Sequence, residues 1–127
     1  MKKIAIVTGG TGGIGSAICK ELGTNGYKVI VNGIDDVAAS KLMDELHELN
    51  VEAEYLHFDV TNEDEVNKNV KYVGEKYGHI DALINNAGGL GGRSRFETMT
   101  TEFYRNVLAL NLDSAFYMSR DCFPYLK

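Results

Sequence analysis

The feature that most constrains this fold is a glycine-rich segment between an unbroken apolar run and an amphipathic stretch. The apolar run predicts a strand over Lys3 to Thr8, and the amphipathic stretch predicts a helix from Ile14. The segment that joins them reads Thr8-Gly9-Gly10-Thr11-Gly12-Gly13-Ile14-Gly15. Glycines let the backbone turn tightly and approach a pyrophosphate, and the N-terminal N–H groups of a helix attract that anion. The segment therefore predicts a loop that holds a diphosphate.

The glycine spacing by itself does not select one family of dinucleotide-binding proteins. It matches GxGxxG from Gly10, TGxxxGxG from Thr8, and TGxxGxxG. The alternative is a tight turn with no ligand. The position of the segment, directly after a strand and at the start of a helix, favours the binding loop.

Short apolar runs alternate with helical periodicity along the whole chain, which is the order that builds a parallel sheet covered by helices. The expected strands are Lys3 to Thr8, Lys28 to Asn32, Glu52 to Phe58 and Ala82 to Asn85. The first expected helix starts at Ile14, and Gly23 with Asn25-Gly26 supplies its stop and turn. The second starts from a cap at Asp35 or Asp36, and the third from a capping box at Thr61 to Asp64 and runs to Gly78. The fourth runs from Thr100 to about Phe123, with a kink at Asn111 to Ser114. We expect one α/β domain over residues 1–127.

Charge and composition exclude several classes of function. A net charge of −5 and the lack of a basic stripe argue against a nucleic-acid partner. The run Ile4 to Val7 is too short for a membrane span or a signal peptide, so we expect a cytoplasmic protein. Cys19 and Cys122 form no CxxC pair, which predicts free buried thiols. His47, His57 and His79 lack metal-ligand spacing, so no metal is expected.

A second motif follows the fourth expected strand. It reads Ile84-Asn85-Asn86-Ala87-Gly88 and comes after Gly78-His79-Ile80-Asp81. Together with the TGxxxGxG loop, Asp59-Val60 and Asn111, this motif resembles the short-chain dehydrogenase/reductases that carry TGxxxGxG and NNAG, and the resemblance covers the whole chain. It implies a Rossmann-like, doubly wound parallel sheet that is truncated after four strands and the long fourth helix.

The resemblance also implies roles for single residues. The phosphate loop would be shaped by Gly9, Gly13 and Gly15, with backbone amides near Ile14 on the pyrophosphate. The adenosine ribose would be lined by Asn86, Ala87 and Gly88, while Asn85 braces the sheet. The implied cofactor-binding residues are Gly9, Thr11, Gly12, Gly13, Ile14, Gly15, Asp59, Val60, Asn86, Ala87 and Gly88.

Two implied roles have ordinary structural alternatives. Asp59 would hold the adenine amino group, although an Asp after a strand is also a common turn former. Asn111, the implied catalytic residue, would kink the long helix and bind the water of a proton relay. In isolation, an Asn at such a position is usually a local cap or a buried hydrogen-bonding group.

The family's other catalytic groups are a Ser, and a Tyr with a Lys four residues later, all C-terminal to the position of Asn111; they are not in this sequence. Tyr72 and Lys76 have the Tyr-x-x-x-Lys spacing, but they precede the fourth strand, and Tyr72 lies off the apolar face of its helix. We expect that pair on a solvated face. The chain is thus expected to be the cofactor-binding half of an oxidoreductase that interconverts a ketone and a secondary alcohol, and to be inactive alone. The alternatives are a non-catalytic NAD(P)-binding module and an assembly fragment.

The end of the second strand bears on the choice of cofactor. A carboxylate there binds the ribose hydroxyls of NAD, whereas a basic group accepts the extra phosphate of NADP. The acid position is Gly33 here, followed by Ile34-Asp35-Asp36 with no Lys or Arg close by. The lack of an acid at position 33 favours NADP(H) slightly over NAD(H).

The resemblance further implies a small carbonyl or alcohol substrate and a homo-oligomer, either a dimer or a tetramer through the long helix. The glycine loop is similar to those of 3-oxoacyl-thioester reductases, with sugar or polyol dehydrogenases as alternatives. Arg93 and Arg95 would attract an anionic substrate or simply be solvated. A sheet that ends at the fourth strand would leave Ala82 to Asn85 as an apolar edge.

Overall fold

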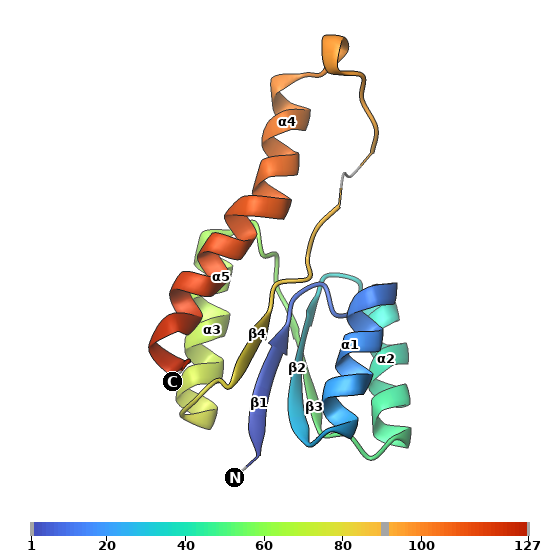
Figure 1. Cartoon of the computed structure of the whole chain (residues 1–127), viewed down its shortest axis with the longest axis vertical. Coiled ribbons are helices and arrows are strands. Elements are labelled where there is room, and N and C mark those ends of the chain that lie inside the picture. Colours follow the sequence, from blue (N-terminus) through green and yellow to red (C-terminus); the bar gives the residue numbers. More distant parts are fainter. Residues whose placement is uncertain (1, 90–91, 127) are drawn as a thin grey trace.

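The computed structural model describes residues 2–89 and 92–126 and, within them, contains a four-stranded parallel sheet in the order β3-β2-β1-β4. Figure 1 shows α1 and α2 on one face of this sheet, and α3 and α5 on the other. The strands are β1 (Lys3–Val7), β2 (Tyr27–Gly33), β3 (Ala53–His57) and β4 (Ala82–Ile84). The main helices are α1 (Gly13–Thr24), α2 (Asp36–Glu48), α3 (Glu63–Tyr77), α4 (Thr101–Leu108) and α5 (Ser114–Cys122). The expected α/β fold class and the order of elements are confirmed.

Two hydrophobic clusters, one on each face of the sheet, explain why β1 and β2 are almost continuously apolar. A parallel strand with helices on both faces has no solvated side on which polar residues are favoured. The buried residues on the α1 and α2 face are Val7, Cys19, Val29, Val31, Leu42, Leu46 and Val51. Those on the α3 and α5 face are Ile4, Ile6, Ile30, Phe58, Val60, Val66, Val70, Val73, Ile80, Met118 and Cys122.

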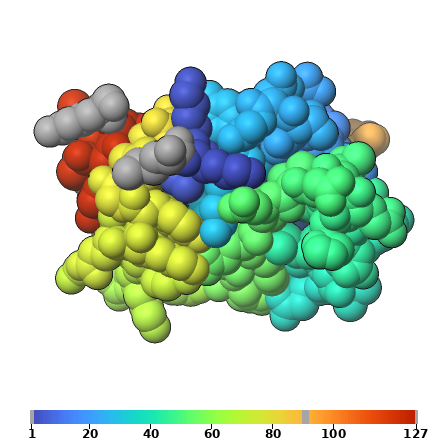
Figure 2. Space-filling model, turned by 90° about the horizontal axis from the view of Figure 1, so that it is seen from below, coloured from blue at the N-terminus to red at the C-terminus, as the bar shows by residue number. Residues whose placement is uncertain are grey.

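At the amino ends of the strands, the start of the chain lies between the segments that lead into β2 and β4. Figure 2 views this end and shows the start of the chain, in dark blue, between the light-blue segment that leads into β2 and the yellow segment that leads into β4. The register agrees, because Lys3 pairs with Tyr27 on β2 and Ala5 pairs with Ala82 on β4. An isolated bridge between Ile80 and Leu126 brings the end of the described chain to the same place.

The long C-terminal helix is interrupted where a kink is expected. Thr100 caps α4, and a π-helical turn, η2 (Ala109–Asp113), separates α4 from α5. Short 3-10 turns, η1 (Phe96–Thr98) and η3 (Phe123–Tyr125), flank the two helices. In Figure 1, α4 and η1 project beyond the carboxyl ends of the strands. No helix in residues 2–89 and 92–126 is both long enough and apolar enough to cross a membrane.

One predicted helix start is wrong by one residue. The cap of α3 is Asn62, whose Oδ1 accepts a hydrogen bond from Glu65 N at 3.1 Å, and not Thr61 as in the predicted Thr61 to Asp64 box. Thr and Asn are both good capping residues, so adjacent candidates are not separated by type. The predicted stop and turn of α1, at Gly23 with Asn25-Gly26, agrees with the structure, because the helix ends at Thr24, Asn25 is its C-cap and Gly26 has a φ of +94°. A side chain at position 23 would collide with Val51.

Burial makes both cysteines poor nucleophiles, which generates a prediction. Burial raises the pKa of Cys19, and separately that of Cys122, from 9.0 to about 12. Because only the thiolate reacts, this rise in pKa lowers the reactive fraction of each thiol near neutral pH about a thousandfold. We expect the native protein to react very slowly with a disulfide reagent at about pH 8, and both thiols to react once guanidinium unfolds it. Fast reaction of either thiol in the native protein would contradict the buried placement.

Candidate functional site

The carboxyl ends of the strands surround a cavity of about 250 Å³. The cavity lies where the strand order reverses on either side of β1, which is the place where open α/β sheets bind ligands. It is lined by Gly9, Thr11, Gly12, Asn32, Gly33, Ile34, Phe58, Asp59, Val60, Ala87, Gly88 and Leu110. Seven predicted cofactor-binding residues are in this lining: Gly9, Thr11, Gly12, Asp59, Val60, Ala87 and Gly88. The other four, Gly13, Ile14, Gly15 and Asn86, lie on α1 or behind the loop.

The phosphate loop needs glycine at several positions for reasons internal to the protein, and Gly9 and Gly15 are two of them. Gly9 has a φ of +59°, in the left-handed region that side chains disfavour. A Cβ at Gly15 would collide with the carbonyl oxygen of Gly9. These contacts bring the first turn of α1 directly against the loop, so both residues set the shape of the turn.

Gly13 differs, because a Cβ at this position would meet no atom of residues 2–89 and 92–126 within 4 Å. Gly13 is the first residue of α1, and within the described part of the chain no side chain caps this helix and no acidic residue lies in its first turn. The neighbouring Ile14 is 75% exposed. The positive end of α1 therefore faces open space at the mouth of the cavity.

The NNAG motif holds the loop from the β4 side. The buried Thr8 hydroxyl accepts hydrogen bonds from the backbone N–H groups of Asn86 and Ala87, both at 3.0 Å. The Asn86 amide in turn donates to the Gly9 carbonyl at 3.1 Å. Two motifs that lie 77 residues apart in sequence are thus joined by three hydrogen bonds.

Asn32 holds the same loop from the β2 side, and sequence reasoning did not assign it to the site. Its Oδ1 accepts from Gly9 N at 3.0 Å, and its Nδ2 donates to the Phe58 carbonyl at 2.8 Å. Only 2% of this residue is exposed. The sequence feature that could have identified Asn32 is its place as a polar residue at the end of an otherwise apolar buried strand. A buried side-chain amide requires hydrogen-bond partners, which indicates a structural role.

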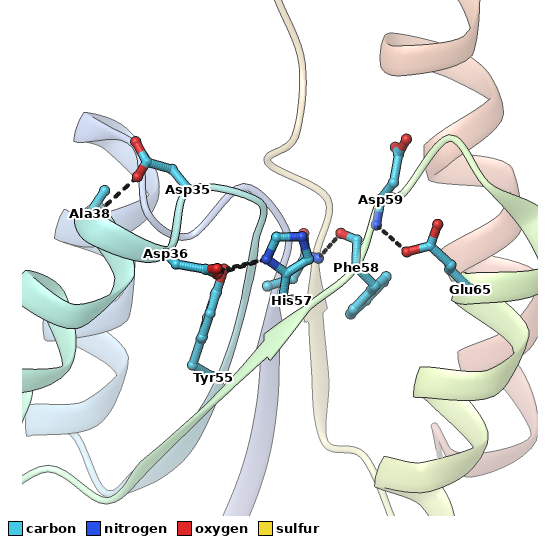
Figure 3. A network of polar contacts seen from close by, with 9 residues as sticks. Asp35, Asp36, Ala38, Tyr55, His57, Phe58, Asp59 and Glu65 are labelled. Atoms are coloured by element: carbon cyan, nitrogen blue, oxygen red, sulfur yellow. Dashed lines mark hydrogen bonds and ion pairs between the residues drawn. The ribbon is translucent and has the colours of Figure 1, made fainter.

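Asp59 forms a turn, the role that the sequence offered as the alternative to binding adenine. Its Oδ1 accepts from the Thr61 N–H at 2.9 Å and from the Thr61 hydroxyl at 2.7 Å. Its own backbone N–H donates to Glu65 at 3.1 Å. Figure 3 shows the exposed carboxylate pointing away from β3, and the residue also lines the cavity. Turn formation and a contact to a ligand are therefore compatible.

Asn111 lies in the π-helical turn and faces the segment after NNAG. Its Nδ2 donates to the carbonyls of Gly89 at 2.6 Å and Val107 at 2.9 Å, and its Oδ1 accepts from Gly89 N at 3.0 Å. A Cβ at Gly88 would meet this oxygen. The Asn111 amide thus joins the interrupted helix to the segment that follows NNAG. The adjacent Leu110 lines the cavity, and the sequence analysis did not predict it.

Other singled-out residues lie away from the cavity lining. The Asn85 amide donates to Ser119 Oγ at 3.1 Å and so ties the end of β4 to α5. Tyr72 and Lys76 both donate to the Glu54 carboxylate on β3, so the pair bridges a helix and a strand at the surface. The exposed Arg95 pairs with Glu97 at 3.8 Å. In residues 2–89 and 92–126, no three His, Cys, Asp or Glu side chains are grouped so as to hold a metal ion.

The curated relatives of this chain include an uncharacterized oxidoreductase and two enzymes that act on different substrates. The chain is 37% identical to an uncharacterized oxidoreductase of Thermotoga maritima, over 94% of this chain and 46% of the relative. It is 35% identical to the 7alpha-hydroxysteroid dehydrogenase of Escherichia coli (98% and 48%) and 32% identical to the 3-oxoacyl-[acyl-carrier-protein] reductase FabG of Buchnera aphidicola (94% and 47%). The chain thus spans about half the length of the curated relatives that it matches.

Two solved structures share the fold closely. One is a metagenomic short-chain oxidoreductase in complex with NADP, with a TM-score of 0.90 and 30% identity over 97% of this chain and 56% of that one. The other is the NADH-dependent reductase A1-R' complexed with NAD, with a TM-score of 0.89 and 35% identity over 98% of this chain and 52% of that one. The family model described as short chain dehydrogenase matches residues 3–127. The chain therefore belongs to the short chain dehydrogenase family.

Proposed function

We propose that this chain is the cofactor-binding part of an NAD(P)(H)-dependent oxidoreductase that interconverts a ketone and a secondary alcohol. The observation that carries the proposal is the contrast between Gly9 and Gly15, which are packed against protein, and Gly13, which faces open space at an uncapped helix start. A glycine without a protein neighbour is explained if a ligand approaches it closely. The relatives bound to NADP and to NAD support the cofactor class.

The residues present fit such a cofactor. The first turn of α1 supplies N–H groups and a positive dipole end for the diphosphate. The cavity beside it offers apolar walls at Ile34, Phe58 and Val60 for an adenine ring, with the Asp59 carboxylate within the same lining for the adenine amino group. The nicotinamide would supply the hydride. In this proposal the proton comes from the family's Ser and Tyr-x-x-x-Lys, which this sequence does not contain.

A 3-oxoacyl thioester is the substrate that we propose, in a cytoplasmic homo-oligomer that associates through the interrupted helix. The similarity to a 3-oxoacyl-[acyl-carrier-protein] reductase supports the substrate class, and the similarity to a hydroxysteroid dehydrogenase keeps other secondary alcohols as competitors. Arg93 and Arg95, in the loop beyond NNAG, would meet the anionic carrier. Comparing turnover of an acetoacetyl thioester, a 7-ketosteroid and a ketose in the complete protein tests the choice.

The role of Gly13 can be tested by two matched alanine substitutions. Gly13→Ala should leave the free energy of unfolding unchanged or raise it by about 0.5–1 kcal/mol, because alanine is the better helix former and meets open space. The same methyl should weaken the binding of NADH and NADPH about tenfold or more, because it occupies the approach to the diphosphate. Fluorescence titration gives the affinities, and thermal unfolding gives the stability.

Gly15→Ala is the matched control, since its Cβ collides with the Gly9 carbonyl. We expect this variant to lose stability as well as binding. If Gly13→Ala binds both cofactors as tightly as the wild type does, the loop does not hold a diphosphate. If the wild-type protein binds neither cofactor, the assignment to NAD(P)(H) fails. Binding without turnover by the complete protein would instead favour the non-catalytic module.

Asn32 should matter for both stability and binding. Asn32→Ala leaves Gly9 N and the Phe58 carbonyl without their partner, which costs about 1–3 kcal/mol of unfolding free energy. Loss of the Gly9 contact should also weaken cofactor binding, because the loop is no longer held in place before the ligand arrives. Asn85→Ala is the control, since it removes one exposed hydrogen bond, to Ser119. Equal effects of the two substitutions on binding, measured by titration, would refute this role.

A further inference from the structure

The π-helical turn η2, between α4 and α5, lies where the helix leaves the sheet and projects beyond the carboxyl ends of the strands (Figure 1). A helix is interrupted most often at Pro, at Gly, or where a side chain enters the backbone hydrogen-bond ladder. Residues 101–122 contain neither Pro nor Gly. We therefore look for the cause of the interruption in the side chains of the turn and of the residue that follows it.

Ser114, the first residue of α5, bonds two successive carbonyls of the turn. In a regular α-helix its N–H would donate to the carbonyl of Leu110, four residues earlier. Here the Ser114 N–H donates to the carbonyl of Ala109, five residues earlier, and the Ser114 hydroxyl donates to Leu110 O at 2.5 Å. The side chain has thus taken the bond that the backbone gives up. Only 4% of Ser114 is exposed, so this hydroxyl is held inside the protein.

Asn111 makes a contact of the same kind one turn earlier. Its Nδ2 donates to the carbonyl of Val107, four residues back, at 2.9 Å. Side chains that bond the carbonyl four residues back compete with the backbone ladder and bend helices. The two residues differ in what else they contact, because Asn111 also bonds Gly89 whereas Ser114 is not part of the cavity lining.

The turn determines which residues the helix presents to the cavity. A π-helical turn contains one more residue than an α-helical turn, so it changes the direction in which the neighbouring side chains point. Within η2, Leu110 lines the cavity, and Asn111 bonds the N–H of Gly89 at 3.0 Å and its carbonyl at 2.6 Å. The carbonyl that Ser114 holds belongs to Leu110 itself. The placement of both residues therefore depends on the serine.

We propose that Ser114 is a positioning residue, which fixes the π-helical turn through the Leu110 carbonyl and so keeps Leu110 and Asn111 against the cavity. It acts through these two neighbours and does not touch the ligand. The effect on cofactor binding rests on the proposed function. The effect on the turn does not, because it is measured in the protein without any ligand.

Hydrogen exchange of the complete protein, followed by mass spectrometry, tests the effect on the turn. The reporter is the Gly89 N–H, which donates to Asn111 Oδ1. Ser114→Ala should make this N–H exchange about fivefold faster, because a loosened turn releases the Asn111 amide. Ser114→Thr should restore the slow exchange, since a threonine hydroxyl can bond the same carbonyl.

Ser119→Ala is the matched control for the exchange experiment. It removes a hydroxyl from the same helix, at an exposed position where the hydroxyl contacts Asn85. We expect exchange at Gly89 to stay as in the wild type. A general loss of stability would make exchange faster throughout the protein, whereas a positioning role makes it faster at Gly89 and leaves the central strands unchanged.

A double-mutant cycle tests whether Ser114 acts through Asn111. Ser114→Ala should weaken the binding of NADH about fivefold in a fluorescence titration. If the serine acts by placing Asn111, the losses do not add, and the double variant Ser114→Ala/Asn111→Ala should bind NADH as tightly as Asn111→Ala alone does. Two residues with independent roles would instead give losses that multiply.

Three results would overturn the inference while the proposed function stands. They are unchanged or uniformly faster exchange in Ser114→Ala, a folded Ser114→Thr variant that exchanges at Gly89 as fast as Ser114→Ala, and multiplied losses in the double variant. If the wild type binds neither cofactor while exchange at Gly89 responds as expected, the proposed function is wrong and the role of Ser114 in the turn is supported.

Discussion

The geometry of the site depends on a loop whose backbone is fixed from two sides before any ligand arrives. On one side, the buried Asn32 amide accepts from Gly9 N and donates to the Phe58 carbonyl, so β1, β2 and the end of β3 are joined at one point. On the other side, Thr8 and Asn86 join the loop to the end of β4. Backbone donors held this way lose little conformational freedom on binding an anion, which is the energetic advantage of a preorganised site.

The glycines of the loop differ in whether contacts within the protein require a residue without a side chain. Gly9, Gly10 and Gly15 are glycine because of the protein, through a left-handed turn at Gly9 and through close approach to Val31 at Gly10 and to the Gly9 carbonyl at Gly15. Gly13 has no such neighbour among the residues that the structure describes. The sequence motif contains both kinds and does not distinguish them, because the distinction depends on which atoms lie opposite each Cβ position.

Local sequence patterns predicted the strands and helices. A site residue that was not predicted, Asn32, depends on contacts between segments that are distant in sequence. The apolar run at Ile4 to Val7 and the helical periodicity from Val66 to Val73 each reflect burial within one element, so the strands and helices could be read from the sequence. The kink at Asn111 was predicted from a break in periodicity, and the structure places a π-helical turn there. Asn32, by contrast, acquires its role from partners 23 and 26 residues away, at Gly9 and Phe58. No pattern within one element contains that information.

The starts of α1 and α2 differ in how much of their positive dipole is left for a ligand. Both helices follow strands of the same sheet, so both present a positive dipole end near the cavity. The α1 start has no capping side chain and no acid in its first turn, and its field is available to a ligand. The α2 start is capped by Asp35, whose carboxylate accepts a hydrogen bond from Ala38 N, and Asp36 adds a second negative charge that offsets the dipole. The positive end of α1 is therefore the more favourable position for a diphosphate, because two carboxylates of the protein already lie at the start of α2.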